Sequence, residues 1–335
     1  MLWLRGQGAT LAAPGSYLDP RQATPEGSAG PRRARPTACA EGAPVPIFET
    51  PRYYLGDWSG NATDAFGVDW VVTSEDGWSS SPPIRPRQED KEAGDGSWAG
   101  PGNYGARVIS LAGIAMAPNR MEMLAAKERI KACITARSKK TLQVEEAHRT
   151  RQALVRLTDQ IDITDKGATG FTWTLIVTAD DPRRYAADTT VASTLLPAAT
   201  DVGRTYPRTY PWTYGAYTPG ATGSVQIDQI GDYDQTPARI TIRGPISAPR
   251  VGHIQTGRSL GFNLALAVGQ TLEIDLGAKT ALLDGTASRV GTLTSGSSWF
   301  LLVPGENELQ FRGVDTGQPT DPDPVMTVTA ASAWT

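Results

Sequence analysis

The sequence contains few of the residues that build catalytic and metal centres. Its 335 residues include two histidines, His148 and His253, and two cysteines, Cys39 and Cys133. Neither histidine has partners at the spacing of zinc ligands, and the cysteines form neither a CxxC motif nor a disulfide framework. We therefore expect two free thiols and two ordinary polar histidines, with no metal site and no cofactor.

Long apolar runs and a strong net charge are also missing. No segment approaches the roughly 20 apolar residues of a membrane-spanning helix. The first ten residues lack the sustained apolar core of a secretory signal. A net charge of −3 gives no general attraction to nucleic acids or to anionic membranes. We expect a chain without a membrane anchor or signal peptide.

Motifs of the common enzyme classes are absent. The sequence has no nucleophile elbow, phosphate-binding loop or zinc-protease motif. Asp159, Asp162 and Asp165 are three residues apart, whereas a calcium loop places its ligands at alternate positions. The acidic pairs 145–146 and 180–181 are sequence neighbours, which point to opposite faces of a strand and cannot flank one scissile bond. These absences predict that the chain is not an enzyme.

Changes in composition predict four segments. Residues 1–46 are rich in Ala, Gly, Pro and Arg and cannot bury a core, so they are either disordered or an arm that orders against a neighbour. Residues 47–197 combine β-type runs with one helix. The Tyr- and Pro-rich residues 198–222 are expected to form a linker. Residues 223–331 show turn signals every ~8–12 residues, which predicts an antiparallel sandwich or barrel.

One amphipathic helix is expected after Pro118. Asn119 is the predicted N-cap, and Glu122 follows at the third position of a capping box. Met123, Lys127 and Ile130 fall on one stripe at helical spacing. We expect this helix to lie on a sheet, which makes the fold class mostly β, or β-rich α+β.

Other local signals predict loops and turns. Residues 78–105 are polar and rich in Gly and Pro, and we interpret them as one long functional or mobile loop. The dipeptides 76–77 and 284–285 are both Asp-Gly, the sequence typical of hairpin turns.

Several short strings, taken in order, resemble the distal tail proteins of long-tailed, siphovirus-type bacteriophages. The resemblance covers roughly residues 50–315. The strings that carry it are FGVDWVVTSEDGW, RVISLAGIA and NRMEMLAAKERIKA in the first half, and PARITIRGP, QTLEIDLGAKTALLDG and WFLLVPGENELQF in the second. Residues 1–46 match nothing in that family.

This resemblance implies a structural component of the virion, made in the host bacterial cytoplasm. Residues 47–197 would be a domain similar to a tail tube subunit, and six copies would close into a ring around a lumen through which the phage DNA passes. A galectin-like β-sandwich would project outward. The implied partners are further copies of the chain, the tail tube protein, and the hub and fibre proteins of the tail tip or baseplate.

Aromatic side chains are the candidate contacts, because they supply large buried areas at interfaces. For Trp70, core packing alone is an equal alternative. The full set of candidate subunit and partner contacts is Tyr53, Tyr54, Trp58, Phe66, Trp70, Trp78, Trp98, Tyr210 and Trp212.

Two other functions stay open. A carbohydrate-binding sandwich contributing to host adsorption would use the aromatic residues of 206–217 as platforms beside polar groups. A tail-associated hydrolase ranks last, since no carboxylate pair is suitable. The sandwich lacks the large insertion with which some relatives bind host carbohydrate, so the resemblance favours a scaffolding role.

Overall fold

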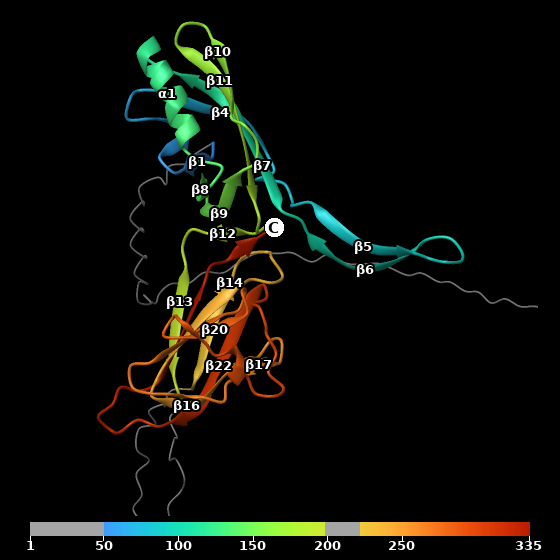
Figure 1. Ribbon diagram of the computed structural model, residues 1–335, viewed down its shortest axis with the longest axis vertical. Helices are drawn as coiled ribbons and strands as arrows, with labels where there is room; N and C mark the ends of the chain where they lie inside the picture. Colours follow the sequence, from blue (N-terminus) through green and yellow to red (C-terminus); the bar gives the residue numbers. More distant parts are fainter. Residues whose placement is uncertain (1–49, 198–221) are drawn as a thin grey trace, which may run out of the picture. The chain divides into compact units, whose positions relative to one another are not determined.

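The computed structural model describes residues 50–197 and 222–335, which fold mainly as antiparallel β-structure (Figure 1). The predicted fold class, mostly β with one helix, is confirmed. The predicted arm, nearly all of the predicted linker, Tyr210 and Trp212 lie outside the described residues. The predicted domain boundaries therefore stay predictions.

The first sheet has eleven strands and curls until its ends meet. Its main path is β2-β1-β8-β9-β11-β7-β4-β3, and the end strands β2 and β3 are joined by Asn61 alone. The strands are β1 (Arg52–Leu55), β2 (Trp58–Gly60), β3 (Ala62–Thr63), β4 (Asp69–Asp76), β7 (Arg107–Met116), β8 (Lys139–Glu146), β9 (Arg149–Leu157), β10 (Asp162–Lys166), β11 (Gly170–Ala179), β12 (Arg184–Ala186) and β24 (Ala333–Trp334).

Alternate side chains of the long strands fill the interior of this curled sheet. Ile109 and Leu111 of β7 are completely buried, while their neighbours in sequence face outward. Trp58, Trp70 and Trp173 meet edge to face, with ring centroids 5.1 to 6.3 Å apart. This aromatic cluster gives the first half of the chain a core of its own.

The predicted helix is α1 (Arg120–Ala132), which packs near β10 and β11 (Figure 1). The side chain of Asn119 accepts a hydrogen bond from the Glu122 amide at 2.9 Å, which confirms the predicted N-cap. Met123 and Ile130 are buried as predicted, but Lys127 reaches outward to Asp165. Within the described residues α1 is the sole α-helix, and its 13 residues are too few and too polar to traverse a bilayer.

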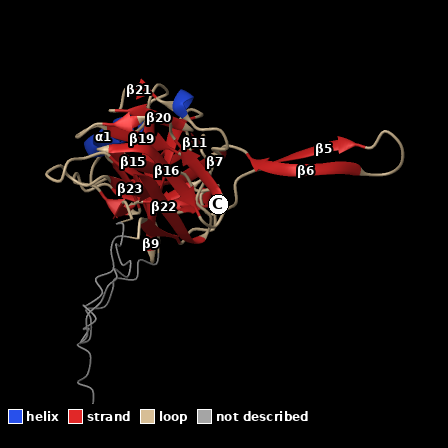
Figure 2. Ribbon diagram, turned by 90° about the horizontal axis from the view of Figure 1, so that it is seen from below, coloured by secondary structure: helices blue, strands red, loops and turns tan. Residues whose placement is uncertain are grey.

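Residues 78–105 are not the single loop that the sequence predicts. They contain a hairpin of β5 (Ile84–Asp90) and β6 (Ser97–Tyr104), drawn in Figure 2 as a two-stranded ribbon. Neither strand buries a face, so no apolar alternation marks them in the sequence. The predicted Asp-Gly hairpin turn at 76–77 is also wrong, because β4 pairs with β7 and the chain instead leaves the sheet at Gly77 with a φ of +87°.

The second half forms two further sheets that enclose a separate core. One has the order β13-β23-β15-β19-β20-β21, and the other has β14-β22-β16-β17 with β18 beside β16. Their strands are β13 (Thr190–Leu195), β14 (Ser224–Gln229), β15 (Ala238–Arg243), β16 (Ile246–His253), β17 (Arg258–Gly261), β18 (Ala265–Leu266), β19 (Thr271–Asp275), β20 (Thr280–Leu283), β21 (Ala287–Ser288), β22 (Gly305–Asp315) and β23 (Val325–Ala330).

Two details of this half bear on the sequence predictions. The turn predicted at 284–285 joins β20 to β21, and both of its residues have positive φ, as the Asp-Gly pair requires. Strand β13 lies within the predicted first domain but pairs with β23 of the second. The final strand, β24, returns to pair with β12 of the first sheet. The two halves are therefore tied together by hydrogen-bonded strands as well as by the chain.

A buried polar network stabilises the end of the second core. His253 is buried, and its imidazole nitrogens lie 3.0 Å from the Asn307 amide oxygen and 2.8 Å from the Thr256 hydroxyl. The imidazole also stacks on Phe300, with ring centroids 5.1 Å apart. Burial lowers the pKa of His253 below its ordinary value, and the smaller effect of the Asn307 bond opposes this shift. The fold therefore favours neutral His253.

We predict that Asn61 is required to close the first sheet. It has a φ of 58°, donates to the Pro51 carbonyl at 2.7 Å and accepts from the Val72 amide at 2.7 Å. Asn61→Ala should lower the free energy of unfolding by about 2–3 kcal/mol, because it removes both bonds and puts alanine in the left-handed region. Asn61→Gly should cost about 1 kcal/mol less. Urea unfolding of both variants checks this. Equal losses of stability in the two variants would contradict the contribution that we assign to the left-handed backbone at residue 61.

We also predict that stability falls in mild acid because of His253. Its folded pKa lies below the unfolded value of 6.5, so the unfolded chain binds more protons as the pH falls through that value. The free energy of unfolding should be level above about pH 7.5 and decline below about pH 6.5. His253→Gln should remove this component of the slope. Thermal unfolding from pH 8 to 5.5 checks it, and identical slopes in both proteins would contradict it.

Candidate assembly interface

The hairpin of β5 and β6 is an exposed feature suited to contact with another molecule. All its residues are exposed except Tyr104, which is half-buried. Trp98 is 70% exposed, and Ile84 is 64% exposed. The Lys91 ammonium lies 5.4 Å from the centre of the Trp98 ring. A large exposed tryptophan on a polar ribbon is more typical of a contact site than of a free surface.

The outward face of β7 and β11 is a second exposed feature, and it carries no charge. Its positions on β7 are 108, 110, 112, 114 and 116, which read Val, Ser, Ala, Ile and Met, and those on β11 add Gly, Thr and Ile. The register sets Ile114 opposite Val71 of β4 on one side and Thr172 of β11 on the other, and Asp69 and Asp76 of β4 border this face opposite Met116 and Ser110. Ile114, Met116 and Val71 are 38%, 56% and 45% exposed. We call this surface the uncharged face.

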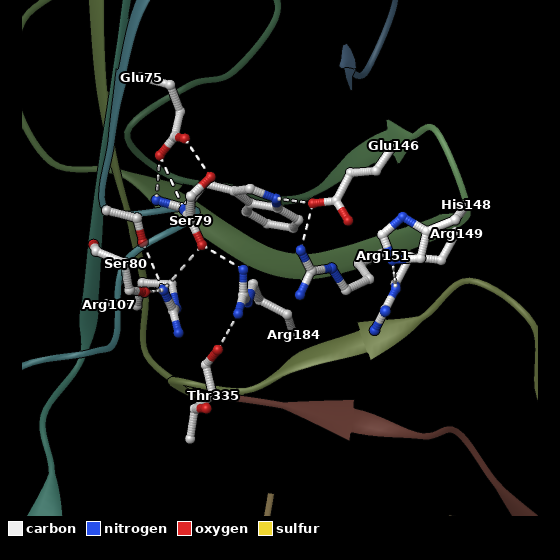
Figure 3. Close-up of polar contacts among 12 residues, drawn as sticks. Glu75, Ser79, Ser80, Arg107, Glu146, His148, Arg149, Arg151, Arg184 and Thr335 are labelled. Carbon is white, nitrogen blue, oxygen red and sulfur yellow. Dashed lines mark hydrogen bonds and ion pairs between the residues drawn. The ribbon is translucent and has the colours of Figure 1, made fainter. Parts of the chain in front are cut away.

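The main chain at the base of the hairpin is held by a buried arginine. Arg107, the first residue of β7, is 1% exposed. Its Nη1 donates to the carbonyl oxygens of Gly77 (2.6 Å), Trp78 (3.2 Å) and Ser80 (2.5 Å), and its Nε donates to that of Pro182 (3.0 Å) (Figure 3). Buried carbonyl groups need such donors, and the guanidinium fork supplies several from one side chain.

A second buried arginine reaches the same segment from β12. Arg184 donates from Nη1 to the Trp78 carbonyl at 2.6 Å and from Nη2 to a main-chain oxygen of Thr335 (Figure 3). Arg184 also pairs with Trp334 of β24 through the sheet. The centre of the Trp334 ring lies 5.1 Å from the Arg149 guanidinium. The residues after β4 and those of β24 are therefore fixed by one group.

Two glutamates complete this network. The carboxylate of Glu75 accepts from the Trp78 amide (2.6 Å), the Ser79 amide (3.1 Å) and the Ser79 hydroxyl (2.7 Å). Glu146 accepts from the Trp78 indole nitrogen at 3.1 Å and from Arg151 (Figure 3). We call these groups, with Arg107 and Arg184, the hairpin anchor.

Charges in the hairpin anchor are balanced within the fold. Burial, together with the smaller effects of the nearby Arg151 and Arg107, lowers the pKa of Arg184 to about 10. Burial opposes ionisation of Glu146, but hydrogen bonds from Arg151 and Trp78 outweigh it and hold its pKa below the usual range. At neutral pH the arginines and Glu146 are therefore all ionised; Glu146 pairs with Arg151, while Arg107 and Arg184 donate to main-chain oxygens.

Four of the predicted contact residues are core residues instead. Tyr53, Trp58, Trp70 and Trp78 are at most 4% exposed and pack inside the first core. A side chain already buried within its own subunit has little area to offer a partner, so these four are core residues, and for Trp70 the alternative of core packing holds. The burial of Tyr53 also raises its pKa to about 12, with smaller contributions from Glu75 and Glu146.

The other predicted residues divide between surface and undescribed chain. Phe66 is 56% exposed, although the Arg129 guanidinium lies 4.2 Å from its ring centre. Tyr54 is half-buried and donates to Glu145 at 3.1 Å. Trp98 is the most exposed of the set, and Tyr210 and Trp212 lie outside the described residues.

Nothing in the described residues groups three or more metal-ligating side chains. Cys133 is a free, buried cysteine, and burial raises the pKa of its thiol to about 11. A thiol so rarely ionised is a poor nucleophile. Sequence reasoning missed the uncharged face and the hairpin anchor. The alternation of inward and outward side chains along residues 107–116 would have indicated the uncharged face.

Comparison with known proteins shows a similarity to phage tail components in the second half of the chain. Residues 230–321 match the family model described as siphovirus-type tail component, C-terminal domain. This match confirms the resemblance to siphovirus distal tail proteins. It also confirms the predicted location in the virion tail, since the family consists of tail components. No curated protein sequence matches this chain.

Two solved structures are similar in fold. The Dit protein of phage SPP1 is 12% identical, with a TM-score of 0.54 over 79% of this chain and 93% of that one. A chain of the phage p2 baseplate, in its activated conformation with strontium, is 11% identical, with a TM-score of 0.43 over 84% of this chain and 98% of that one. Of these two, only the SPP1 protein exceeds a TM-score of 0.5, and at this identity the likeness shows a shared fold.

We predict that Arg107 contributes strongly to stability. Arg107→Met should lower the free energy of unfolding by about 3 kcal/mol or more, because it removes four hydrogen bonds that a buried side chain donates to main-chain carbonyl groups. Arg87→Met makes the same change on the exposed strand β5 and should alter stability by less than about 0.5 kcal/mol. Chemical unfolding of both variants provides the comparison, and similar small effects would show that the hairpin anchor has little structural weight.

Proposed function

We propose that this chain is a structural protein of the siphophage tail that forms a ring at the distal end of the tail tube. The observation that carries the proposal is the match of residues 230–321 to a siphovirus tail component. The fold shared with SPP1 Dit, described as a paradigm of the hub adsorption apparatus in phages that infect Gram-positive bacteria, supports it. In this proposal the chain joins the tube to the tail tip or baseplate and serves as an assembly hub.

The first half of the chain would supply the contacts between copies. The uncharged face offers exposed apolar side chains without the desolvation cost of burying charge. The hairpin would reach an adjacent copy, and the hairpin anchor would hold its base in a fixed direction. Such contacts are heterologous, with different surfaces meeting, and they close into a ring when the rotation permits. The expected number of six copies comes from the family resemblance.

Other tail proteins would bind around this ring. We propose the tail tube protein on one side, and the hub and fibre proteins of the tail tip or baseplate on the other, with phage DNA passing through the lumen without specific binding. The net charge of −3 agrees with passive passage, since it gives no strong attraction to DNA. We propose no catalytic activity.

The hairpin should be required for assembly but not for folding. Replacing residues 88–99 by Asn-Gly would shorten the ribbon at the level of the Arg87–Gly100 pair and remove Trp98. We expect thermal stability close to that of the parent chain, and loss of the ring in native mass measurement and negative-stain images. A shortened chain that still formed the parent ring would exclude the hairpin from the contact.

A charge on the uncharged face gives an independent test. Ile114→Glu should block ring closure, because burying an unpaired carboxylate costs several kcal/mol. Ile254→Glu is the matched control, since Ile254 is also an exposed isoleucine, 48% exposed against 38%, but lies in the second half. A parent chain that stays monomeric even with tail tube protein added, or equal effects of the two substitutions, would contradict the proposed contact.

A further inference from the structure

A pocket of about 370 Å³ lies at one end of the two sheets of the second half. Four separate segments line it: residues 234–235 before β15, residues 256–258 between β16 and β17, the turn 276–279 between β19 and β20, and residues 299–303 before β22. Both sheets contribute, so the pocket lies where the loops of the sandwich converge. Its volume falls in the ordinary range for small-molecule sites.

The wall formed by residues 299–303 is held in place by the interior. Leu302 and Thr236 exchange two main-chain hydrogen bonds of 2.9 Å each. Asn307 accepts from the Val303 amide and donates to its carbonyl, both at 2.8 Å, while the buried Phe300 ring stacks on His253. These contacts fix this wall of the pocket without a ligand, which lowers the entropy cost of binding.

Several polar side chains in this pocket are unpaired. Asp234, Gln235 and Lys279 are exposed, and within the described part of the chain their side chains have no hydrogen-bond or ion-pair partner in the protein. Arg258 donates one hydrogen bond from Nη1 to the Trp299 carbonyl, at 3.1 Å, and its other donors have no partner in the described residues. This contrasts with the hairpin anchor, where most polar groups are bonded within the fold.

An aromatic ring stands beside these groups. Trp299 is half-buried, packs against the second core and lines the pocket. Lys279 also lines it, from a turn in which its φ is 56°, a conformation that glycine adopts without strain. A turn selected for backbone fit alone would favour glycine, whereas lysine adds an ammonium donor at the pocket.

Taken together, we propose that this pocket binds a saccharide. A pyranose offers an apolar ring face for Trp299 and vicinal hydroxyl groups that both donate and accept hydrogen bonds. Asp234 accepts, Lys279 and Arg258 donate, and the amide of Gln235 does both. Two cations beside one carboxylate suit a neutral or singly acidic sugar. The proposal goes beyond the ring function and does not depend on it.

The site differs from the aromatic platforms that the sequence suggested at 206–217, which lie outside the described residues. It requires only loops of the sandwich, and none of its lining residues belongs to the uncharged face, the hairpin or the hairpin anchor. Sugar binding and ring formation can therefore fail separately.

The test uses the full chain and four probes: methyl glucopyranoside, methyl galactopyranoside, N-acetylglucosamine and glucuronic acid. Saturation-transfer NMR titrations should detect at least one of them with millimolar affinity. Trp299→Ala and Gln235→Ala should each weaken that affinity by about ten-fold or more, since each removes a main contact. Trp98→Ala is the matched control, because it removes an exposed tryptophan from the hairpin and should leave the affinity unchanged.

Lys279→Gly separates binding from folding. It should keep or raise thermal stability by relieving the positive φ, while weakening saccharide binding several-fold. Failure of all four probes to bind at tens of millimolar would overturn the proposal. Binding that is equally strong in the Trp299, Gln235 and Lys279 variants would also overturn it by placing the sugar elsewhere. Ring formation, measured in the same preparations, should be unchanged in the Trp299, Gln235 and Lys279 variants.

Discussion

The donation of hydrogen bonds from Arg107 and Arg184 to the main chain of residues 77–80 is the interaction on which the first half depends. This segment leaves the sheet at Gly77, where an added Cβ would lie 1.8 Å from the Val108 carbonyl oxygen, so the chain is forced close to β7. Its carbonyl groups, among them that of the buried Trp78, then need donors that no strand provides. Two guanidinium groups supply them, and Glu75 and Glu146 offset the added charge.

A rigid base makes an exposed hairpin useful. A two-stranded ribbon without a buried face is at best marginally stable in water, so its direction must be set where it leaves the sheet. The hairpin anchor sets it through contacts that join β4, β7, β12 and β24. Polar groups of this kind are costly when they are buried and unpaired. Here their hydrogen bonds fix the base of the hairpin.

Local signals predicted the parts of this fold that depend on local physics. The Asn119 cap and the Asp-Gly turn at 284–285 follow from short-range hydrogen bonding and backbone preference, and both were predictable. The hairpin was missed because apolar alternation reports a buried face, which it lacks. Trp58 and Trp70 were assigned to contacts because an aromatic residue indicates buried area without showing which molecule buries it. Arg107 bonds to residues 27 to 75 positions away, so no local pattern reveals it.

The two halves of the chain use polar groups in opposite ways, and this difference separates assembly from recognition. In the first half, Arg107, Arg184, Glu75 and Glu146 are bonded within the fold, beside an uncharged face and an exposed hairpin. At the end of the sandwich, His253 and Asn307 are bonded inward, whereas Asp234, Gln235 and Lys279 around Trp299 are left unpaired. Because the two halves have separate cores, loops of the sandwich can change without altering the packing of the first half.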